Sequence, residues 1–235
     1  MTSQLVGIDF DALDPERLAR FWSALLGRER IGVTIPDGGS GFRITFVSTA
    51  EPKTTQNRIH FDLTSSPLQD QGTLVDRALK LGARHADVGQ SPDEPHVVLA
   101  DPEGNEFCVT ESGNRFLTDT DLIGAVNCDG TQALGYFWSA AFEWPLVWDQ
   151  DQETAIQSPG GGSKVTWSGP PLMPRSHRER LRLVVAPRST DAPLEVLRLV
   201  ALGAVAASRS EAGPTTLFDP DGNEFTLTST VATST

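Results

Sequence analysis

The ten residues 101–110, DPEGNEFCVT, return almost unchanged as residues 219–228, DPDGNEFTLT. Seven of the ten positions are identical, at an offset of 118 residues. Within each stretch, Asp-Pro sets the φ angle at the second position of a turn, and the glycine supplies a positive φ two residues later. Each stretch is therefore predicted to reverse the chain between two short strands.

Further landmarks repeat in the same order, so the whole chain is predicted to be a duplication. The repeated landmarks are FWSA at 21–24 and 137–140, LGA at 81–83 and 202–204, and RIH at 58–60 matching RLR at 180–182. The net charge of −12 divides equally between the two halves. We predict two tandem domains, residues 1–115 and 120–235.

Within the first half, strand and helix patterns alternate. Asp14 is predicted to cap a helix that begins at Pro15, and apolar residues follow at helical spacing as far as Gly27. A second helix is predicted over residues 68–81, ending at Gly82. Because alternating strand patterns precede and follow each helix, the fold class is predicted to be α+β.

Composition excludes several classes of protein. The chain has 235 residues, 38% of them hydrophobic, and no apolar run approaches the ~20 residues that a membrane-spanning helix requires. It begins without a signal-peptide pattern, so a cytoplasmic protein is predicted, in which Cys108 and Cys128 stay unpaired. The negative charge argues against nucleic acid and anionic membranes as partners.

The motifs together resemble the vicinal-oxygen-chelate superfamily. They are DPERLARFW at 14–22 after a strand, a strand that carries His60, and the signature at 101–107. This superfamily includes glyoxalase I, extradiol dioxygenases, fosfomycin-modifying enzymes, methylmalonyl-CoA epimerase and bleomycin-resistance proteins. The likeness is strongest to tandem glyoxalase-like proteins of the kind common in actinobacteria, and it covers nearly the whole chain. It implies that paired βαβββ modules form an eight-stranded, cup-shaped sheet in each domain.

The resemblance also implies where a metal site would lie. In metal-dependent relatives, His, His and Glu project into the cup from its first, fifth and eighth strands and hold a divalent ion that acts as a Lewis acid. The matching positions are Gly7, His60 and Cys108 in the first copy and Gly124, Arg182 and Thr226 in the second. Since only His60 keeps a family ligand, we predict that the protein has no metal cofactor.

Neighbouring residues leave a metal in the first copy as an alternative. Asp9 lies on the same face of the first strand as Gly7, because side chains alternate along a strand with a period of two. Asp9, His60 and Cys108 would together offer oxygen, nitrogen and sulfur ligands, a set that suits zinc. His60 and Cys108 would equally line a pocket that holds no metal.

Other side chains are assigned to ligand binding on the same reasoning. His96 lies on the strand before the signature and is expected either to face the cup or to serve only in packing. Arg182 could pair with a carboxylate or phosphate of a ligand, or with acidic groups of the protein itself. Trp144, Trp148 and Trp167 lie on predicted strands of the second copy, where they form an aromatic site or pack in the core.

The predicted function is binding of a small organic molecule in one or both cups, as in a bleomycin-resistance-like protein. A first alternative is a lyase or isomerase in which His60 shuttles a proton. In a second alternative, one domain is a structural support for the other. The sequence is compatible with a monomer and with a homodimer.

Overall fold

The computed structural model describes residues 2–65, 70–175, 177–188, 191–208 and 213–228. Its elements are β1 (Ser3–Ala12), α1 (Pro15–Leu26), β2 (Thr34–Ile35), β3 (Arg43–Ser48), β4 (Ile59–Leu63), α2 (Gln71–Lys80), β5 (Arg84–His85), β6 (Val97–Ala100), β7 (Glu106–Val109), β8 (Ile123–Cys128), α3 (Gln132–Phe142), β9 (Leu146–Gln150), β10 (Glu153–Gln157), β11 (Lys164–Trp167), β12 (Leu181–Pro187), α4 (Ala192–Leu202), β13 (Val205–Ser208), β14 (Thr215–Phe218) and β15 (Glu224–Leu227). A strand, a helix and two or three further strands thus recur four times. We call these units modules 1 to 4, spanning residues 3–48, 59–109, 123–167 and 181–227.

The modules form two sheets, and each sheet joins one module from each half of the chain. Sheet A has seven strands in the order β13-β14-β15-β12-β1-β3-β2, and so combines modules 4 and 1. Sheet B has eight strands in the order β5-β6-β7-β4-β8-β11-β10-β9, and combines modules 2 and 3. At the centre of each sheet, the first strands of the two modules run antiparallel, β1 beside β12 and β4 beside β8. The α+β class and the tandem duplication are confirmed, and both sheets bridge the halves.

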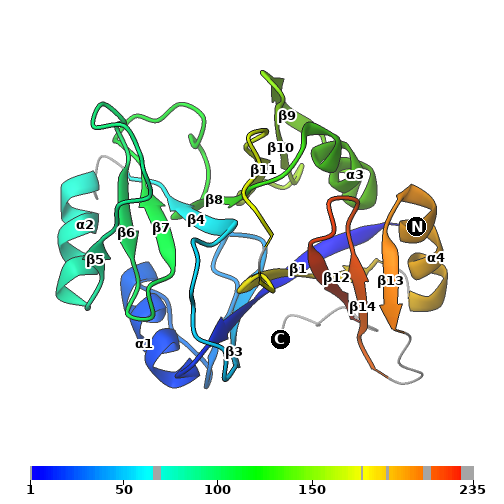
Figure 1. The fold of residues 1–235 in the computed structure, drawn as a ribbon, viewed down its shortest axis with the longest axis horizontal. Helices are drawn as coiled ribbons and strands as arrows, with labels where there is room; N and C mark the ends of the chain where they lie inside the picture. Colours follow the sequence, from blue (N-terminus) through cyan, green and yellow to red (C-terminus); the bar gives the residue numbers. More distant parts are fainter. Residues whose placement is uncertain (1, 66–69, 176, 189–190, 209–212, 229–235) are drawn as a thin grey trace.

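The four helices lie outside the sheets, and α2 and α4 occupy opposite ends of the molecule (Figure 1). Asp14 caps α1 as predicted, since its Oδ1 accepts a hydrogen bond of 3.0 Å from the backbone N–H of Arg17. Gly27 ends this helix in the left-handed conformation with φ 67°. The second helix begins at Gln71, capped by Asp70; the part of its prediction that falls on residues 66–69 lies outside the described residues.

The repeated signature attaches a turn of one module to the helix of the preceding module. Asp101 accepts hydrogen bonds from its own turn and one of 3.2 Å from the indole N–H of Trp22 in α1. Asp219 holds Trp138 of α3 in the same way, at 3.4 Å. Gly104 has φ 87°, as the predicted turn requires. In each half, the Phe-Trp landmark and the Asp-Pro signature recognised in the sequence are therefore joined by a hydrogen bond.

The acidic residue in the third position of each signature holds the start of the same helix. Glu103 accepts from the backbone N–H groups of Leu13 and Asp14, at 2.9 and 2.8 Å. Asp221 accepts from the backbone N–H and the hydroxyl of Thr131, at 2.7 and 3.0 Å. Carboxylates at these positions satisfy free N–H groups and complement the helix dipole. Modules 1 and 2, and likewise 3 and 4, are thus joined by helix contacts while their strands pair elsewhere.

None of the helices in the described part of the chain has the length and apolar character needed to cross a lipid bilayer. The core between helices and sheets is instead a single apolar cluster rich in aromatic rings. Its largest fully buried side chains include Trp22, Trp138 and Trp167. The helix-covered faces of both sheets are therefore filled, which leaves the opposite faces for a functional site.

Candidate functional site

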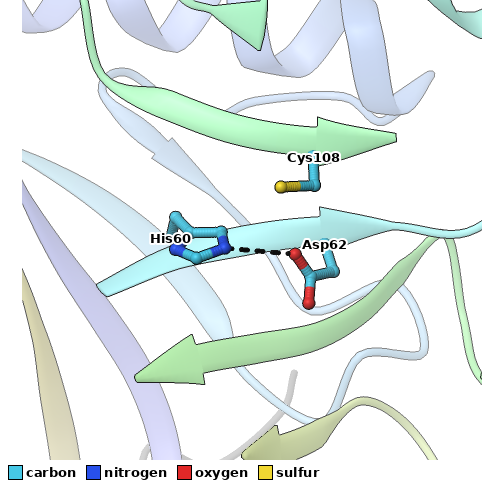
Figure 2. A group of neighbouring side chains, drawn as sticks. All are labelled: His60, Asp62 and Cys108. Atoms are coloured by element: carbon cyan, nitrogen blue, oxygen red, sulfur yellow. Dashed lines mark ion pairs between the residues drawn. The ribbon is translucent and has the colours of Figure 1, made fainter. Parts of the chain in front are cut away.

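Three side chains that suit chemistry meet on the face of sheet B turned away from the helices. His60 and Asp62 project from β4 and Cys108 from the neighbouring strand β7, as Figure 2 shows. His60 Nε2 lies 3.3 Å from Asp62 Oδ1, and one ligand atom from each of the three residues lies within 4.8 Å of the others. The side chains of His60 and Asp62 are 24% and 15% exposed. We call these residues the β4–β7 cluster.

The cluster holds His60 in its charged form. Burial on its own lowers the pKa of this imidazole, but its hydrogen bonds to Asp62 and Cys108 outweigh burial and raise the pKa to about 10. Burial also raises the pKa of the Cys108 thiol, although His60 acts in the opposite direction. The ion pair is therefore an imidazolium with the Asp62 carboxylate, beside a neutral thiol.

We expect His60 to stay protonated through neutral pH. Its folded-state pKa lies above the ordinary value of 6.5, so the ion pair stabilises the fold fully below pH 6.5 and this contribution is lost as the pH rises toward 10. In Asp62→Asn, His60 remains buried but loses the neighbouring carboxylate, so the pKa of its imidazole should fall by several units. NMR titration of the imidazole signals, with His60 assigned through its loss in His60→Gln, measures this. A wild-type midpoint near 6.5 would contradict the proposed ion pair.

Neighbouring strands add polar and small side chains to the same face. Asn127 on β8 lies opposite His60, and its Nδ2 donates a hydrogen bond of 3.2 Å to Asp62 Oδ2. The row continues through Thr166 and Ala155 to Trp148 on the edge strand β9. Four strand spacings separate His60 from Trp148, about 19 Å along the sheet. Thr166 and Ala155 are buried, so the charged end at His60 and the aromatic end at Trp148 are two separate exposed parts of this face.

The equivalent face of sheet A is filled by the protein's own charges. Arg182 lies opposite Asp9 in sheet A, as His60 lies opposite Asn127 in sheet B. Its guanidinium forms two bonds to the carboxylate of Asp11, of 2.6 and 2.9 Å, and its side chain is only 3% exposed. The sequence left two kinds of partner for Arg182, a ligand or acidic groups of the protein. The structure shows that acidic groups of the protein pair with it.

A comparison with known protein families finds the same family in both halves of the chain. The glyoxalase-like domain family matches residues 7–110 and again 124–228. The chain belongs to the glyoxalase-like family. No curated protein matches it.

Solved structures with this architecture share the fold at low sequence identity. Glyoxalase I from Zea mays aligns with a TM-score of 0.62 at 11% identity, over 97% of this chain and 92% of that one. A variant of the same maize enzyme gives 0.63 at 12% identity, with the same coverage. A proposed dioxygenase from Bacillus subtilis gives 0.62 at 12% identity, over 96% of this chain and 84% of that one. These neighbours show that the fold extends over both halves of the chain.

The metal-ligand set considered for the first copy, Asp9 with His60 and Cys108, does not come together in the structure. Asp9 lies on β1 in sheet A, whereas His60 and Cys108 lie in sheet B, because the sheets pair modules across the two halves. Burial raises the pKa of Asp9 against the opposing effect of Arg182. The carboxylate that does join the cluster is Asp62, which shares the face of His60 through the period of two along β4. That spacing was the sequence signal that could have found it.

The three tryptophans assigned to the second cup separate in the structure. Trp148 is 37% exposed on the open face of sheet B, where its ring meets Phe116 edge-on at 6.0 Å. Trp167 is 1% exposed and lies on the opposite face, in the core. Trp144 lies in the connection between α3 and β9 rather than on a strand, and is buried against Phe142. Of the three, Trp148 is the one whose side chain is substantially exposed.

The cluster includes neither His96 nor a residue that lines either of two cavities. His96 comes just before β6 and lies 3.7 Å from the carboxylate of Glu94. A cavity of about 390 Å³ opens between residues 49–58 on one side and Pro174 with residues 177–180 on the other. A second cavity, of about 300 Å³, lies between the glycine-rich turns near 37–41 and 158–162. Neither cavity is lined by the β4–β7 cluster, whose partly exposed side chains lie on the sheet face itself.

Proposed function

We propose that this glyoxalase-like protein binds a small organic molecule on the open face of sheet B, at the β4–β7 cluster and without a metal at neutral pH. The observation that carries the proposal is the contrast between the two sheets. In sheet A the central position is closed by the ion pair of Arg182 with Asp11, which is almost fully buried. In sheet B the same position holds the partly exposed His60. Sheet A then serves as the structural partner of sheet B.

The chemistry of the face indicates the class of ligand. The His60 imidazolium donates to an oxygen, and a charge-assisted bond of this kind favours a carboxylate, phenolate or polarised carbonyl. Trp148 and Phe116 offer ring faces and edges at the far end. The Lys164 ammonium lies 4.4 Å from the centre of the Phe116 ring and donates to the Phe116 carbonyl. These rings lie about 19 Å from His60, too far for a small molecule to contact both, so the ligand class is set by the cluster itself and is a small molecule with an anionic or polarised oxygen.

The charged state of His60 bears on the catalytic alternative. A general base must be unprotonated at the working pH, and its efficiency is greatest when its pKa lies near that pH. A pKa of about 10 leaves His60 protonated, so it suits hydrogen bonding or proton donation better than proton abstraction. This supports ligand binding over a lyase or isomerase in which His60 removes a proton.

A divalent ion at the same cluster is the second candidate. His60, Asp62 and Cys108 offer nitrogen, oxygen and sulfur atoms within 4.8 Å of one another, a donor set that fits zinc. Three protein ligands with an open position are the pattern of catalytic zinc sites, where the ion acts as a Lewis acid. Protons on His60 and Cys108 must leave first, so protons compete with the metal and affinity should rise with pH.

Thermal-shift and fluorescence titrations with small aromatic acids, phenols and ketones test the proposal. Chelator-treated protein should gain melting temperature through mass action when a ligand binds. His60→Ala should weaken binding by about tenfold to a hundredfold, through loss of a charged hydrogen bond. The matched control is His85→Ala, an exposed histidine on the edge strand β5, which should bind as the wild type does.

The same titration with added zinc separates the two candidates. Shifts that appear only with zinc would favour the metal-dependent site over the metal-free one. Equal binding by wild type and His60→Ala would contradict a role for the cluster, as would the absence of any shift across the library in both conditions.

A further inference from the structure

The cavity of about 390 Å³ lies where the two halves of the chain meet. One wall is the connection between β3 and β4, residues 49–58, and the other is Pro174 with residues 177–180, which precede β12. The volume falls within the range of about 300–1,000 Å³ found for small-molecule sites, which often lie between domains. Among the described residues, none of the positions that match the family's metal ligands lines it. The cavity is therefore a candidate for a second site, separate from the β4–β7 cluster.

The lining of this cavity is more basic than the protein as a whole. Four arginine or lysine side chains line it against three of aspartate or glutamate, although the chain carries a net charge of −12. The basic residues are Lys53, Arg58, Arg178 and Arg180, joined by His177. Clustered positive charge in a concave site attracts anions. Lys53 pairs with Glu106 at 2.5 Å and Arg178 with Glu224 at 2.6 Å, so any unmatched charge must come from the other two arginines.

Arg58 and Arg180 are duplicates of each other, and both side chains are almost fully buried. Each immediately precedes the first strand of its module, and its Nη2 donates to a backbone carbonyl, that of Asp129 for Arg58 and that of Asp11 for Arg180. Two carboxylates neutralise Arg58, since its Nε lies 2.8 Å from Asp129 and its Nη1 lies 3.1 Å from Glu179. Arg58 thus shows how this fold pairs such an arginine when both carboxylates are available.

The carboxylate equivalent to that of Asp129 is turned away from Arg180. Asp11 stands beside Arg180 as Asp129 stands beside Arg58, but its two oxygens accept from Arg182, at 2.6 and 2.9 Å. In sheet B the position of Arg182 is held by the histidine of the β4–β7 cluster, which leaves Asp129 free to pair with Arg58. The difference between the two arginines therefore follows from one substitution between the copies.

Arg180 is consequently left with an unmatched donor. It pairs with the carboxylate of Glu103 at 3.0 Å, and Glu103 also holds the N–H groups at the start of α1. The Nε of Arg180 is buried and has no hydrogen-bond partner in the part of the chain that the structure describes. Because buried polar groups of native proteins are normally paired, an unmatched guanidinium N–H beside a cavity indicates a partner that enters from outside.

We propose that the cavity binds a small organic anion, whose carboxylate or phosphate group takes the place beside Arg180 that Asp129 has beside Arg58. A planar guanidinium matches the geometry of both kinds of oxyanion. The rest of the ligand lies against exposed polar side chains of the first wall, such as Thr55 and Gln56. Because the two walls belong to different halves of the chain, the ligand joins them, and binding stabilises the fold by mass action.

NMR titration of the full chain with inorganic phosphate and with succinate tests the proposal, and glycerol is the uncharged control. The amide signals of residues 54–57 and 177–180 should shift saturably, with a dissociation constant of about 1 mM or lower. Saturation with phosphate alone indicates a phosphorylated ligand, and saturation with succinate alone indicates a carboxylic acid. The shifts should persist in His60→Ala, which lacks the site proposed on sheet B, so each proposal can fail without the other.

Two variants test the part assigned to Arg180. Arg182→His copies the residue of sheet B and releases Asp11 to pair with Arg180, so anion binding should weaken about tenfold or more. His177→Glu adds a negative charge at an exposed position of the lining, and should weaken binding about tenfold with little change in the melting temperature of the free protein. The matched control is His85→Glu on β5, an exposed histidine outside the lining, which should bind as the wild type does.

Three results would overturn the proposal. The first is the absence of a saturable shift at these amides with either anion, or an equal shift with glycerol. The second is loss of the cavity shifts in His60→Ala. The third is equal binding by the wild type and by folded His177→Glu, and this comparison decides the matter if Arg182→His does not fold.

Discussion

Replacing Arg58 by methionine is expected to lower the free energy of unfolding by about 3–5 kcal/mol, because it leaves buried carboxylates without their partner. The Arg58 side chain is 6% exposed. Its Nε lies 2.8 Å from Asp129, and its Nη1 lies 3.1 Å from Glu179 and 3.0 Å from Asn223. All three partners belong to the second half of the chain. One side chain thus links the two halves through groups that water cannot easily reach.

The control for Arg58 is Arg178→Met. Arg178 pairs with Glu224 at 2.6 Å, but its side chain is 55% exposed, and exposed ion pairs contribute only about 0–1 kcal/mol. Urea denaturation of both variants, with the slope of the transition compared as well as its midpoint, measures the difference. Equal losses in the two variants would contradict the role assigned to the buried network.

Replacing Trp22 by alanine is expected to cost about 3–5 kcal/mol, the range for deleting a large buried aromatic side chain. Trp22 is 1% exposed. Its ring lies 5.1 Å from Phe107, 5.4 Å from Phe61 and 6.1 Å from Phe10, measured between centroids. Phe61 is on β4 between His60 and Asp62, so the same change should also disturb the cluster on the other face of that strand.

Two further variants separate packing from the hydrogen bond. Trp22→Phe keeps most of the aromatic contact but removes the N–H that donates to Asp101, so it should cost about 1–3 kcal/mol. Trp148→Ala removes a ring that is 37% exposed, and should change stability far less. A large loss of stability for Trp148→Ala would show that this ring is structural.

Local features of the chain were predictable because their causes lie close together in sequence. The Asp14 cap depends on the backbone N–H of Arg17, three residues away, and the signature turn depends on bonds within five residues. Apolar spacing alone identified the buried face of α1, including Trp22. The duplication could be recognised for a similar reason, because the same local patterns recur in the same order in both halves of the chain.

The candidate site was only partly predictable. His60 and Cys108 were recognised as belonging together, whereas Asp9 was placed beside them in error and Asp62 and Asn127 were missed. All four modules begin with an alternating strand, and alternation determines which side chains share a face but not which strand lies alongside. The choice of neighbour depends on packing between residues far apart in the chain, such as His60 opposite Asn127.

The amino-acid sequence by itself therefore determined the duplicated modules, their turns and caps, and the family to which they belong, because each depends on short-range geometry. Tertiary structure decided that modules 1 and 4 share one sheet and modules 2 and 3 the other. It also decided that Arg182 is neutralised by Asp11 while His60 remains accessible beside Asp62. Pairing of charges and of strands depends on distances in space, and those distances exist only once the sheets have formed.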